Sequence, residues 1–195
     1  QNDSDHRARI TVLQMGPSDP RLARRYFAGR SERNISIAVL TETVRRAGGD
    51  IAIRDAYKRF LGRSVGAVVA VLAAEDGLTI IVPQLADMRQ DLYERFRREL
   101  KAMDGVDDVL EGNEWPLCVA SSSQPERIRL SLDITGLREK FGPNIFSASM
   151  VGRGKPSPDL FLHAAKAMQV APHRCIVIED SPAGIVAARR AGMRV

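Results

Sequence analysis

The chain has 195 residues, of which 44% are hydrophobic and 27% charged, and its formal net charge is +5. These proportions are typical of globular proteins and argue against a disordered, collagen-like or coiled-coil chain. No run approaches the ~20 apolar residues of a membrane span, and the polar, acidic start does not resemble a secretory signal, so we expect a cytoplasmic protein. The two cysteines, Cys118 and Cys175, lie in apolar runs. This predicts buried free thiols in a reducing compartment, with a disulfide between them as the alternative.

The positive charge is concentrated near the N-terminus, where residues 1–33 hold seven arginines against four acids. A nucleic-acid-binding protein concentrates its positive charge on a folded face that carries a reading element. The segment 1–33 has weak periodicity and no such element. We therefore do not expect nucleic acid as a partner.

The first hundred residues divide into an irregular segment and a helical one. Within residues 1–33, only the apolar run 10–13 has the composition of a short strand. Over residues 34–100, apolar side chains recur at helical spacing in four stretches separated by glycines and proline. The pattern predicts an all-helical subdomain of four helices, the third of them capped by Ser64.

From residue 101 onward, short apolar runs alternate with helical patterns. The runs 117–120, 145–148 and 175–178 are the expected strands, and a helix is expected after each. Uniformly apolar strands that alternate with helices predict a buried parallel sheet. One more strand is expected to start at 193–195, where the sequence stops, so we expect an incomplete sheet.

Polar side chains follow the expected strands at their carboxyl ends, where open α/β sheets bind ligands. Ser121 ends one strand, Glu179 and Asp180 end another, and Lys155 precedes a helix. The helix N-termini that follow favour anions. A hydroxyl, an ammonium and two carboxylates on one rim suit a phosphate group together with Mg²⁺.

Each of these groups also has a structural explanation when it is taken alone. Ser121 could cap the next helix, whose start has the spacing of a capping box at Ser123 and Glu126. Lys155 could lie in an ordinary turn, and the two carboxylates could simply complement a helix dipole. Their occurrence together, in this order and at strand ends, favours a phosphate site.

Three segments resemble sequence motifs of the haloacid dehalogenase (HAD) superfamily. Residues 117–123 look like its second motif, 154–159 like its third and 178–184 like its fourth. The likeness is greatest to the β-phosphoglucomutase-like branch of sugar-phosphate phosphatases. It covers about residues 31–195.

The resemblance implies a role for each group at the strand ends. Ser121 and Ser122 would bind the transferring phosphoryl group, and Lys155 would neutralise its charge. Glu179 and Asp180 would bind Mg²⁺. These residues are the expected catalytic, substrate-binding and metal-binding residues of the chain.

The resemblance also implies the domain organisation. Residues 34–100 resemble the helical cap of the family, and within them residues 59–64 look like the loop that faces the substrate. Arg63 and Lys58 are candidate contacts to the substrate, and a solvated helix end explains each of them equally well. The expected fold is α/β, with a Rossmann-like parallel sheet core over 101–195, incomplete at its C-terminus, and an inserted all-helical cap subdomain. Residues 1–33 are expected to be an aberrant segment that replaces the first core strand.

The chain departs from the family at the first motif, an apolar strand followed by Asp-x-Asp, whose first Asp is the nucleophile and whose second is the acid/base. Residues 31–32 look like the tail of that motif. Counting back in register places Ala23 at the nucleophile position and Arg25 at the acid/base position. Alanine has no nucleophile, and an arginine with a pKa above ~12 cannot shuttle protons near neutral pH. The lost carboxylate is also a metal ligand, so we expect weakened Mg²⁺ binding.

Other N-terminal acids do not supply the missing group. Asp3 and Asp5 have the right spacing but no strand before them, and Asp19 is a single acid between serine and proline. Residues 10–15 are the available replacement for the central strand. A disrupted reading frame and a genuine pseudoenzyme both explain the departure.

The sequence thus predicts a Mg²⁺-dependent phosphatase or phosphomutase of the HAD family, acting on small sugar phosphates or similar esters, with little or no turnover. The alternative is a non-catalytic protein that binds a phosphorylated metabolite. We expect a monomer with a small phosphorylated metabolite as its partner and no membrane association.

Overall fold

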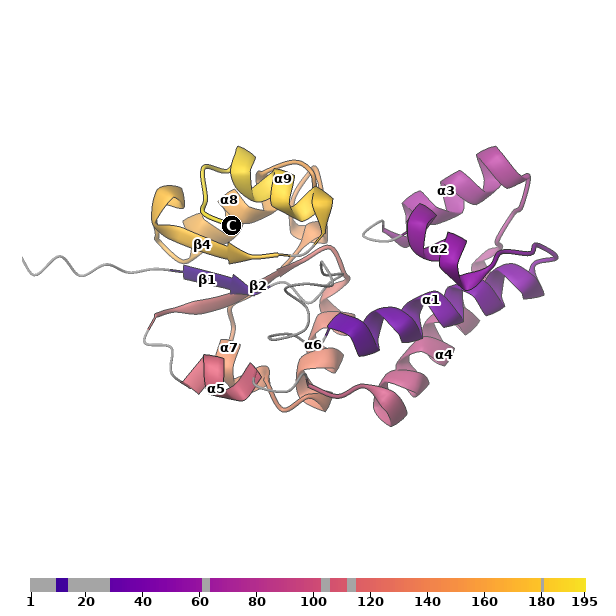
Figure 1. Cartoon of the computed structure of the whole chain (residues 1–195), viewed down its shortest axis with the longest axis horizontal. Helices are drawn as coiled ribbons and strands as arrows, with labels where there is room; N and C mark the ends of the chain where they lie inside the picture. Colours follow the sequence, from indigo (N-terminus) through magenta and orange to yellow (C-terminus); the bar gives the residue numbers. More distant parts are fainter. Residues whose placement is uncertain (1–9, 14–28, 61–63, 103–105, 112–114, 180) are drawn as a thin grey trace, which may run out of the picture.

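The structure is a computed structural model, and the part of the chain that it describes comprises residues 10–13, 29–60, 64–102, 106–111, 115–179 and 181–195. In Figure 1 a parallel sheet with helices on both faces lies beside a separate group of helices. None of the described helices is both long enough and apolar enough to cross a membrane.

Four strands form the described sheet: β1 (Ile10–Leu13), β2 (Leu117–Ser121), β3 (Ile145–Ser147) and β4 (Cys175–Ile178). Their order is β3-β2-β1-β4, and every pairing is parallel. The apolar run at 10–13 therefore occupies a central position, between β2 and β4. The strand expected at 193–195 amounts to a single bridge between Arg194 and Ile176.

Helices cover both faces of the sheet (Figure 1). Helices α8 (Asp159–Ala167) and α9 (Pro182–Arg190) lie on one face, and α5 (Val106–Glu111), α6 (Pro125–Ile134) and α7 (Arg138–Phe141) lie on the other. The side chains of β2 alternate accordingly. Cys118 and Ala120 pack in the first layer, and Leu117 and Val119 pack in the second. Because both faces are covered, the strand is apolar from Leu117 to Ala120, as expected for a buried parallel sheet.

The separate helical block comprises α1 (Gly29–Arg46), α2 (Ile53–Phe60), α3 (Val65–Asp76) and α4 (Val82–Glu99). Helix α1 buries residues on two sides. Ile35 and Val39 pack with Phe96 of α4, whereas Ile37 and Val44 pack in the cluster that α2 and α3 complete.

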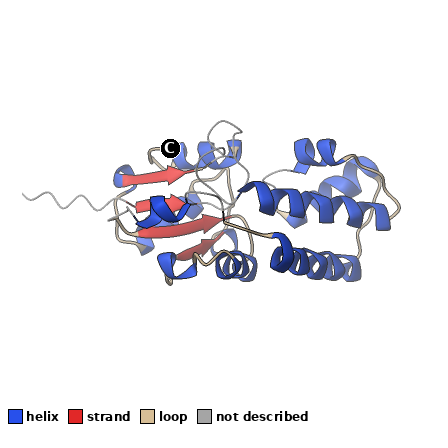
Figure 2. Ribbon diagram, turned by 60° about the horizontal axis from the view of Figure 1, so that its bottom comes forward, coloured by secondary structure: helices blue, strands red, loops and turns tan. Residues whose placement is uncertain are grey.

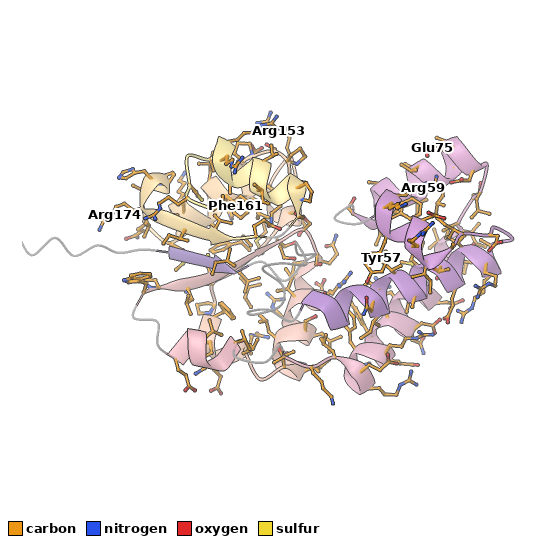
Figure 3. The ribbon with its side chains drawn as sticks, viewed as in Figure 1. Tyr57, Arg59, Glu75, Arg153, Phe161 and Arg174 are labelled. Atoms are coloured by element: carbon orange, nitrogen blue, oxygen red, sulfur yellow. The ribbon has the colours of Figure 1, made fainter. Side chains whose placement is uncertain are left out.

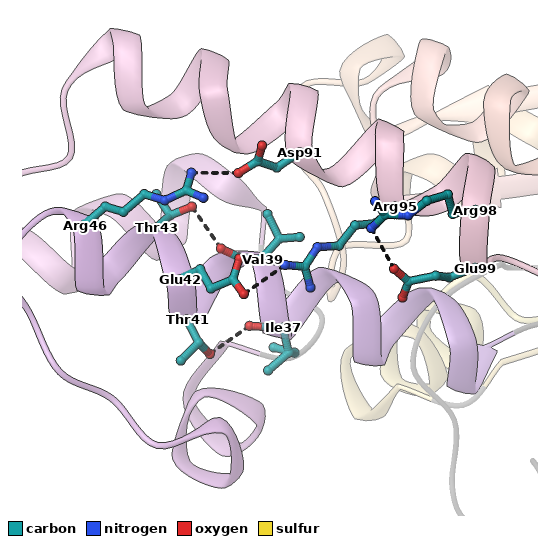
Figure 4. A network of polar contacts seen from close by, with 10 residues as sticks. All are labelled: Ile37, Val39, Thr41, Glu42, Thr43, Arg46, Asp91, Arg95, Arg98 and Glu99. Carbon is teal, nitrogen blue, oxygen red and sulfur yellow. Dashed lines mark hydrogen bonds and ion pairs between the residues drawn. The ribbon is translucent and has the colours of Figure 1, made fainter.

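Side-chain caps and ion pairs reinforce this block. Ser64 caps α3 as predicted, and its Oγ accepts a hydrogen bond from the amide of Ala67. Figure 4 shows the polar contacts along α1 and α4, including those of Glu42 with Arg95 and Arg46 with Asp91. The buried hydroxyls of two threonines bond to carbonyls within α1, so they leave no unpaired polar group.

Short segments were the least predictable parts of the fold. Helices α5 and α7 and the 3-10 turns Ala148–Met150 and Pro172–Arg174 were not expected from the sequence. The capping box at Ser123 and Glu126 was wrong, because Gln124 is the N-cap of α6 and Pro125 begins the helix. The backbone groups of Ser123 are instead bonded to serine hydroxyls.

Cys118 and Cys175 are free and buried, as predicted. They lie in β2 and β4, on opposite sides of β1. Adjacent strands are ~4.8 Å apart, so two spacings separate the cysteines by about 10 Å, whereas a disulfide spans at most ~7 Å between Cα atoms. The disulfide alternative is therefore wrong for this fold.

Candidate phosphate-binding site

The carboxyl ends of the parallel strands point toward the helical block, as Figure 2 shows. β2 ends at Ser121, and Glu179 directly follows β4. Ser121 and Glu179 thus lie at one edge of the sheet, which is the edge where open α/β sheets bind ligands.

Lys155 and Glu179 form a buried ion pair at this edge. The Lys155 Nζ lies 2.9 Å from Glu179 Oε2 and donates a second hydrogen bond to the carbonyl of Ala120 at 3.1 Å. The side chains are 2% and 0% exposed, respectively. The Nζ also lies 4.5 Å from the ring centroid of Phe161, the α8 side chain labelled in Figure 3. A buried charge is costly unless it is paired and hydrogen-bonded, and both conditions are met here.

The first turn of α9 holds the other oxygen of Glu179. The amide of Ser181 donates to Glu179 Oε1 at 2.9 Å, and Ser181 Oγ accepts from the amide of Gly184 at 3.0 Å. A Cβ on Gly184 would lie 2.2 Å from Glu179 Oε2. The glycine therefore makes room for the carboxylate, a role that was not assigned to it from the sequence although it belongs to the quoted motif.

Ser121 is buried at the end of β2, and its Oγ accepts a hydrogen bond from the amide of Ser123 at 3.1 Å. This bond closes a turn between the strand and α6 rather than capping the helix. The neighbouring Ser122 is half-buried in the same turn. Sequence reasoning missed Ser147, which ends β3 and donates to the carbonyl of Ser123 at 2.7 Å.

The structure leaves several predicted site residues untested. Arg63, Asp180, Ala23 and Arg25 lie outside the described residues. Lys58 is exposed on α2. Its role as a contact to the substrate stays a prediction.

The loop 59–64 was expected to face the substrate, but its first residue is bonded within the helical block. The Arg59 guanidinium pairs with Glu75 at 3.0 Å and with Asp76 at 2.6 Å, and Figure 3 shows Arg59 beside Glu75. The hydrogen bond from Arg59 lowers the pKa of the Asp76 carboxyl. Arg59 thus holds α2 against the end of α3.

A divalent cation needs several oxygen ligands. Among the described residues, no group of three acidic, histidine or cysteine side chains is placed to hold a metal ion. Glu179 is the described carboxylate at this edge, and its two oxygens are bonded to Lys155 and Ser181. The described residues do not by themselves fit a Mg²⁺ ion.

Comparison with known proteins identifies the family. A family model for haloacid dehalogenase-like hydrolases matches residues 18–192. The chain is 31% identical over 142 residues to the 6-phosphogluconate phosphatase of Escherichia coli (strain K12), a match that covers 72% of this chain. It spans 64% of that relative, less than two thirds of its length.

Solved structures agree in fold. A conserved haloacid dehalogenase-like protein of unknown function from Agrobacterium tumefaciens has a TM-score of 0.71 at 33% identity, over 84% of this chain and 75% of that one. A HAD family hydrolase from Deinococcus radiodurans, crystallised with bound phosphate and sodium, has a TM-score of 0.66 at 26% identity, over 98% and 80% of the two chains. The sheet order, the buried strand-end residues and the extent of the family match lead to one assignment: the chain belongs to the haloacid dehalogenase-like hydrolases.

Proposed function

We propose that this protein binds small sugar phosphates or similar phosphate esters at the carboxyl edge of its sheet, and that it hydrolyses them slowly or not at all. The observation that carries the proposal is the buried Lys155–Glu179 pair beside Ser121, in a HAD-like core. The relative from Escherichia coli, a 6-phosphogluconate phosphatase, supports the substrate class. The helical block, roughly residues 34–100, is proposed as the cap over this edge.

The binding role follows from the local electrostatics. The Lys155 ammonium is buried, and charges interact more strongly in such a low-dielectric setting than in water. It would attract a phosphate dianion and stabilise the charge on its oxygens. Ser121, whose Oγ already accepts a bond from the Ser123 amide, would donate its own proton to a phosphoryl oxygen.

The low turnover follows from the missing nucleophile. Phosphoryl transfer to the enzyme needs a carboxylate that attacks phosphorus in line and forms an aspartyl-phosphate. Counting from the family motif places Ala23 there, and the residue that follows β1 in the sequence is Gln14. Neither side chain carries a carboxylate. The same loss would weaken Mg²⁺ binding, because it removes a ligand from a site whose described carboxylate is already bonded to Lys155.

Thermal unfolding with inorganic phosphate and with 6-phosphogluconate tests the binding. A ligand at 100 times its Kd adds about 2.7 kcal/mol to the free energy of unfolding, so the wild type should melt at a higher temperature. Ser121→Ala, which leaves the ion pair in place, should lose most of this shift, and so should Lys155→Ala. Lys140→Ala is the control, because Lys140 makes an exposed pair with Glu111. A wild type that phosphate does not stabilise would refute the proposed binding.

Hydrolysis of p-nitrophenyl phosphate, measured with and without Mg²⁺, tests the second half of the proposal. We expect turnover that is close to the buffer rate and that does not depend on Lys155. Turnover that is lost in Lys155→Ala but kept in Lys140→Ala would show that another group supplies the nucleophile, and the proposed inactivity would then be wrong.

A further inference from the structure

The end of β3 carries a fully buried serine beside the candidate phosphate site. Ser147 is paired in register with Ser121 of the neighbouring strand β2. Its Oγ donates to the carbonyl of Ser123 at 2.7 Å and accepts from the amide of Ser149 at 3.2 Å. The hydroxyl of Ser149 lies 2.9 Å away. The Ser147 hydroxyl therefore has both a donor and an acceptor role fixed by neighbouring groups.

Ser123 connects this hydroxyl to Ser121. Its carbonyl is held by Ser147, and its amide donates to Ser121 Oγ at 3.1 Å. The position of the Ser121 hydroxyl thus depends on the turn 121–123, and the turn depends on a bond from a different strand. Neither dependence is visible in local sequence patterns, because Ser147 lies 24 positions beyond Ser123.

Ser147 lies in the edge strand of the described sheet, one strand farther than Ser121 from β1 and β4. Its described side-chain bonds are with the turn and with Ser149, not with Lys155 or Glu179. Ser147 is therefore arranged to hold Ser121 in position, rather than to contact the phosphoryl group itself.

We propose that Ser147 is a positioning residue that sets the affinity for the phosphoryl group by holding the turn 121–123. The inference rests on the proposed phosphate-binding function and adds a residue to it. When the Ser147 hydroxyl is removed, the Ser123 carbonyl loses its buried donor, the turn relaxes, and Ser121 Oγ leaves the position from which it donates to phosphate. A 1 Å displacement of a binding group is enough to weaken such a contact strongly.

The test is the Kd of inorganic phosphate, measured by titration calorimetry on folded protein, for the wild type and for Ser147→Ala. One lost hydrogen bond to a binding turn corresponds to a roughly tenfold weaker Kd. Ser131→Ala is the matched control. Ser131 is also buried, but its Oγ has no partner among the described residues, so the same chemical change should alter the Kd less than about twofold.

A second variant keeps the test decisive if Ser147→Ala does not fold. Ser147→Cys retains a similar volume, but its thiol is only a weak donor, so its Kd should lie between those of the wild type and Ser147→Ala. Unchanged phosphate affinity in the Ser147 variants, with wild-type binding intact, would overturn the positioning role even if their melting temperatures fall. If the wild type does not bind phosphate, the proposed function fails and the inference falls with it.

Discussion

Removal of the Arg127 guanidinium should weaken the attachment of the helical block to the core. Arg127 lies in the first turn of α6, and its Nε and Nη2 both donate to Glu32 Oε1 of α1, at 3.1 and 2.9 Å. Its Nη2 also donates to Ser36 Oγ at 2.8 Å. The guanidinium carbon lies 5.3 Å from the ring centroid of Phe96 on α4. One side chain of the core thus contacts two helices of the block.

Burial determines the size of the expected effect. The Glu32 side chain is 7% exposed and that of Arg127 is 22% exposed. Glu32 Oε2 already has no hydrogen-bond partner among the described residues, so truncation of Arg127 would leave a buried carboxylate unpaired. Breaking a buried pair costs about 3–5 kcal/mol, and the partial exposure of Arg127 points to the lower limit, about 3 kcal/mol.

The chain offers a matched control in the pair of Arg95 with Glu42. This pair has a similar distance, 2.7 Å, but its side chains are 27% and 36% exposed, and both residues belong to the helical block. Pairs at exposed positions contribute about 0–1 kcal/mol. Arg95→Ala should therefore cost at most about 1 kcal/mol and should not affect the contact between α1 and α6.

Urea unfolding of Arg127→Ala and Arg95→Ala measures how much more free energy of unfolding the first variant loses. The single variant Glu32→Gln and its combination with Arg127→Ala then test the cause. Glu32→Gln combined with Arg127→Ala should be less destabilised than the sum of the single changes, because the amide removes the uncompensated charge. Equal losses in Arg127→Ala and Arg95→Ala, or strict additivity in the double variant, would refute the reasoning.

Two substitutions and one chemical modification test other parts of the structure. Gly184→Ala should lower the free energy of unfolding by about 1–3 kcal/mol, because its Cβ would displace the Glu179 carboxylate; an unchanged urea midpoint would contradict this. Burial raises the pKa of the Cys118 thiol to about 12, so iodoacetamide at pH 8 should modify it only after unfolding, and mass spectrometry of native protein should find it unmodified. The bond from Arg153 lowers the pKa of Asp159 in the folded protein, so the stability advantage of the wild type over Asp159→Asn should be present at pH 7 and shrink below about pH 4; an advantage that stays constant down to pH 3 would argue against it.

Much of the core could be predicted because its signals are local. The runs at 117–120 and 175–178 are short, uniformly apolar and followed by polar residues, and both form strands of the parallel sheet. The sequence likewise predicted that Lys155 and Glu179 would lie close together, since carboxyl ends of parallel strands share one edge. Their ion pair confirms that expectation.

The remaining features depend on contacts between distant parts of the chain. The Ser123 amide, which a capping box would use, is bonded to Ser121, and the Ser123 carbonyl is bonded to Ser147 of another strand; no periodicity in the sequence reports these bonds. The interaction of Glu32 with Arg127 joins residues 95 positions apart. The position of the first motif was uncertain for a different reason, which is the spacing between the motif and the helical block. Counting from residues 31–32 assumed a constant spacing, whereas the strand that fills the central position ends at Leu13, and the assignment of Ala23 stays a prediction.

The central strand has a consequence for how the sheet and the first motif depend on the sequence. β1 joins β2 to β4 through main-chain amides and carbonyls. This pairing does not depend on which side chains follow the strand. Four extended residues, one of them a threonine, form this central strand of the described sheet. Completing the sheet and supplying a nucleophile are therefore separate requirements on this segment. A sequence can meet the requirement for the sheet without meeting the requirement for the nucleophile.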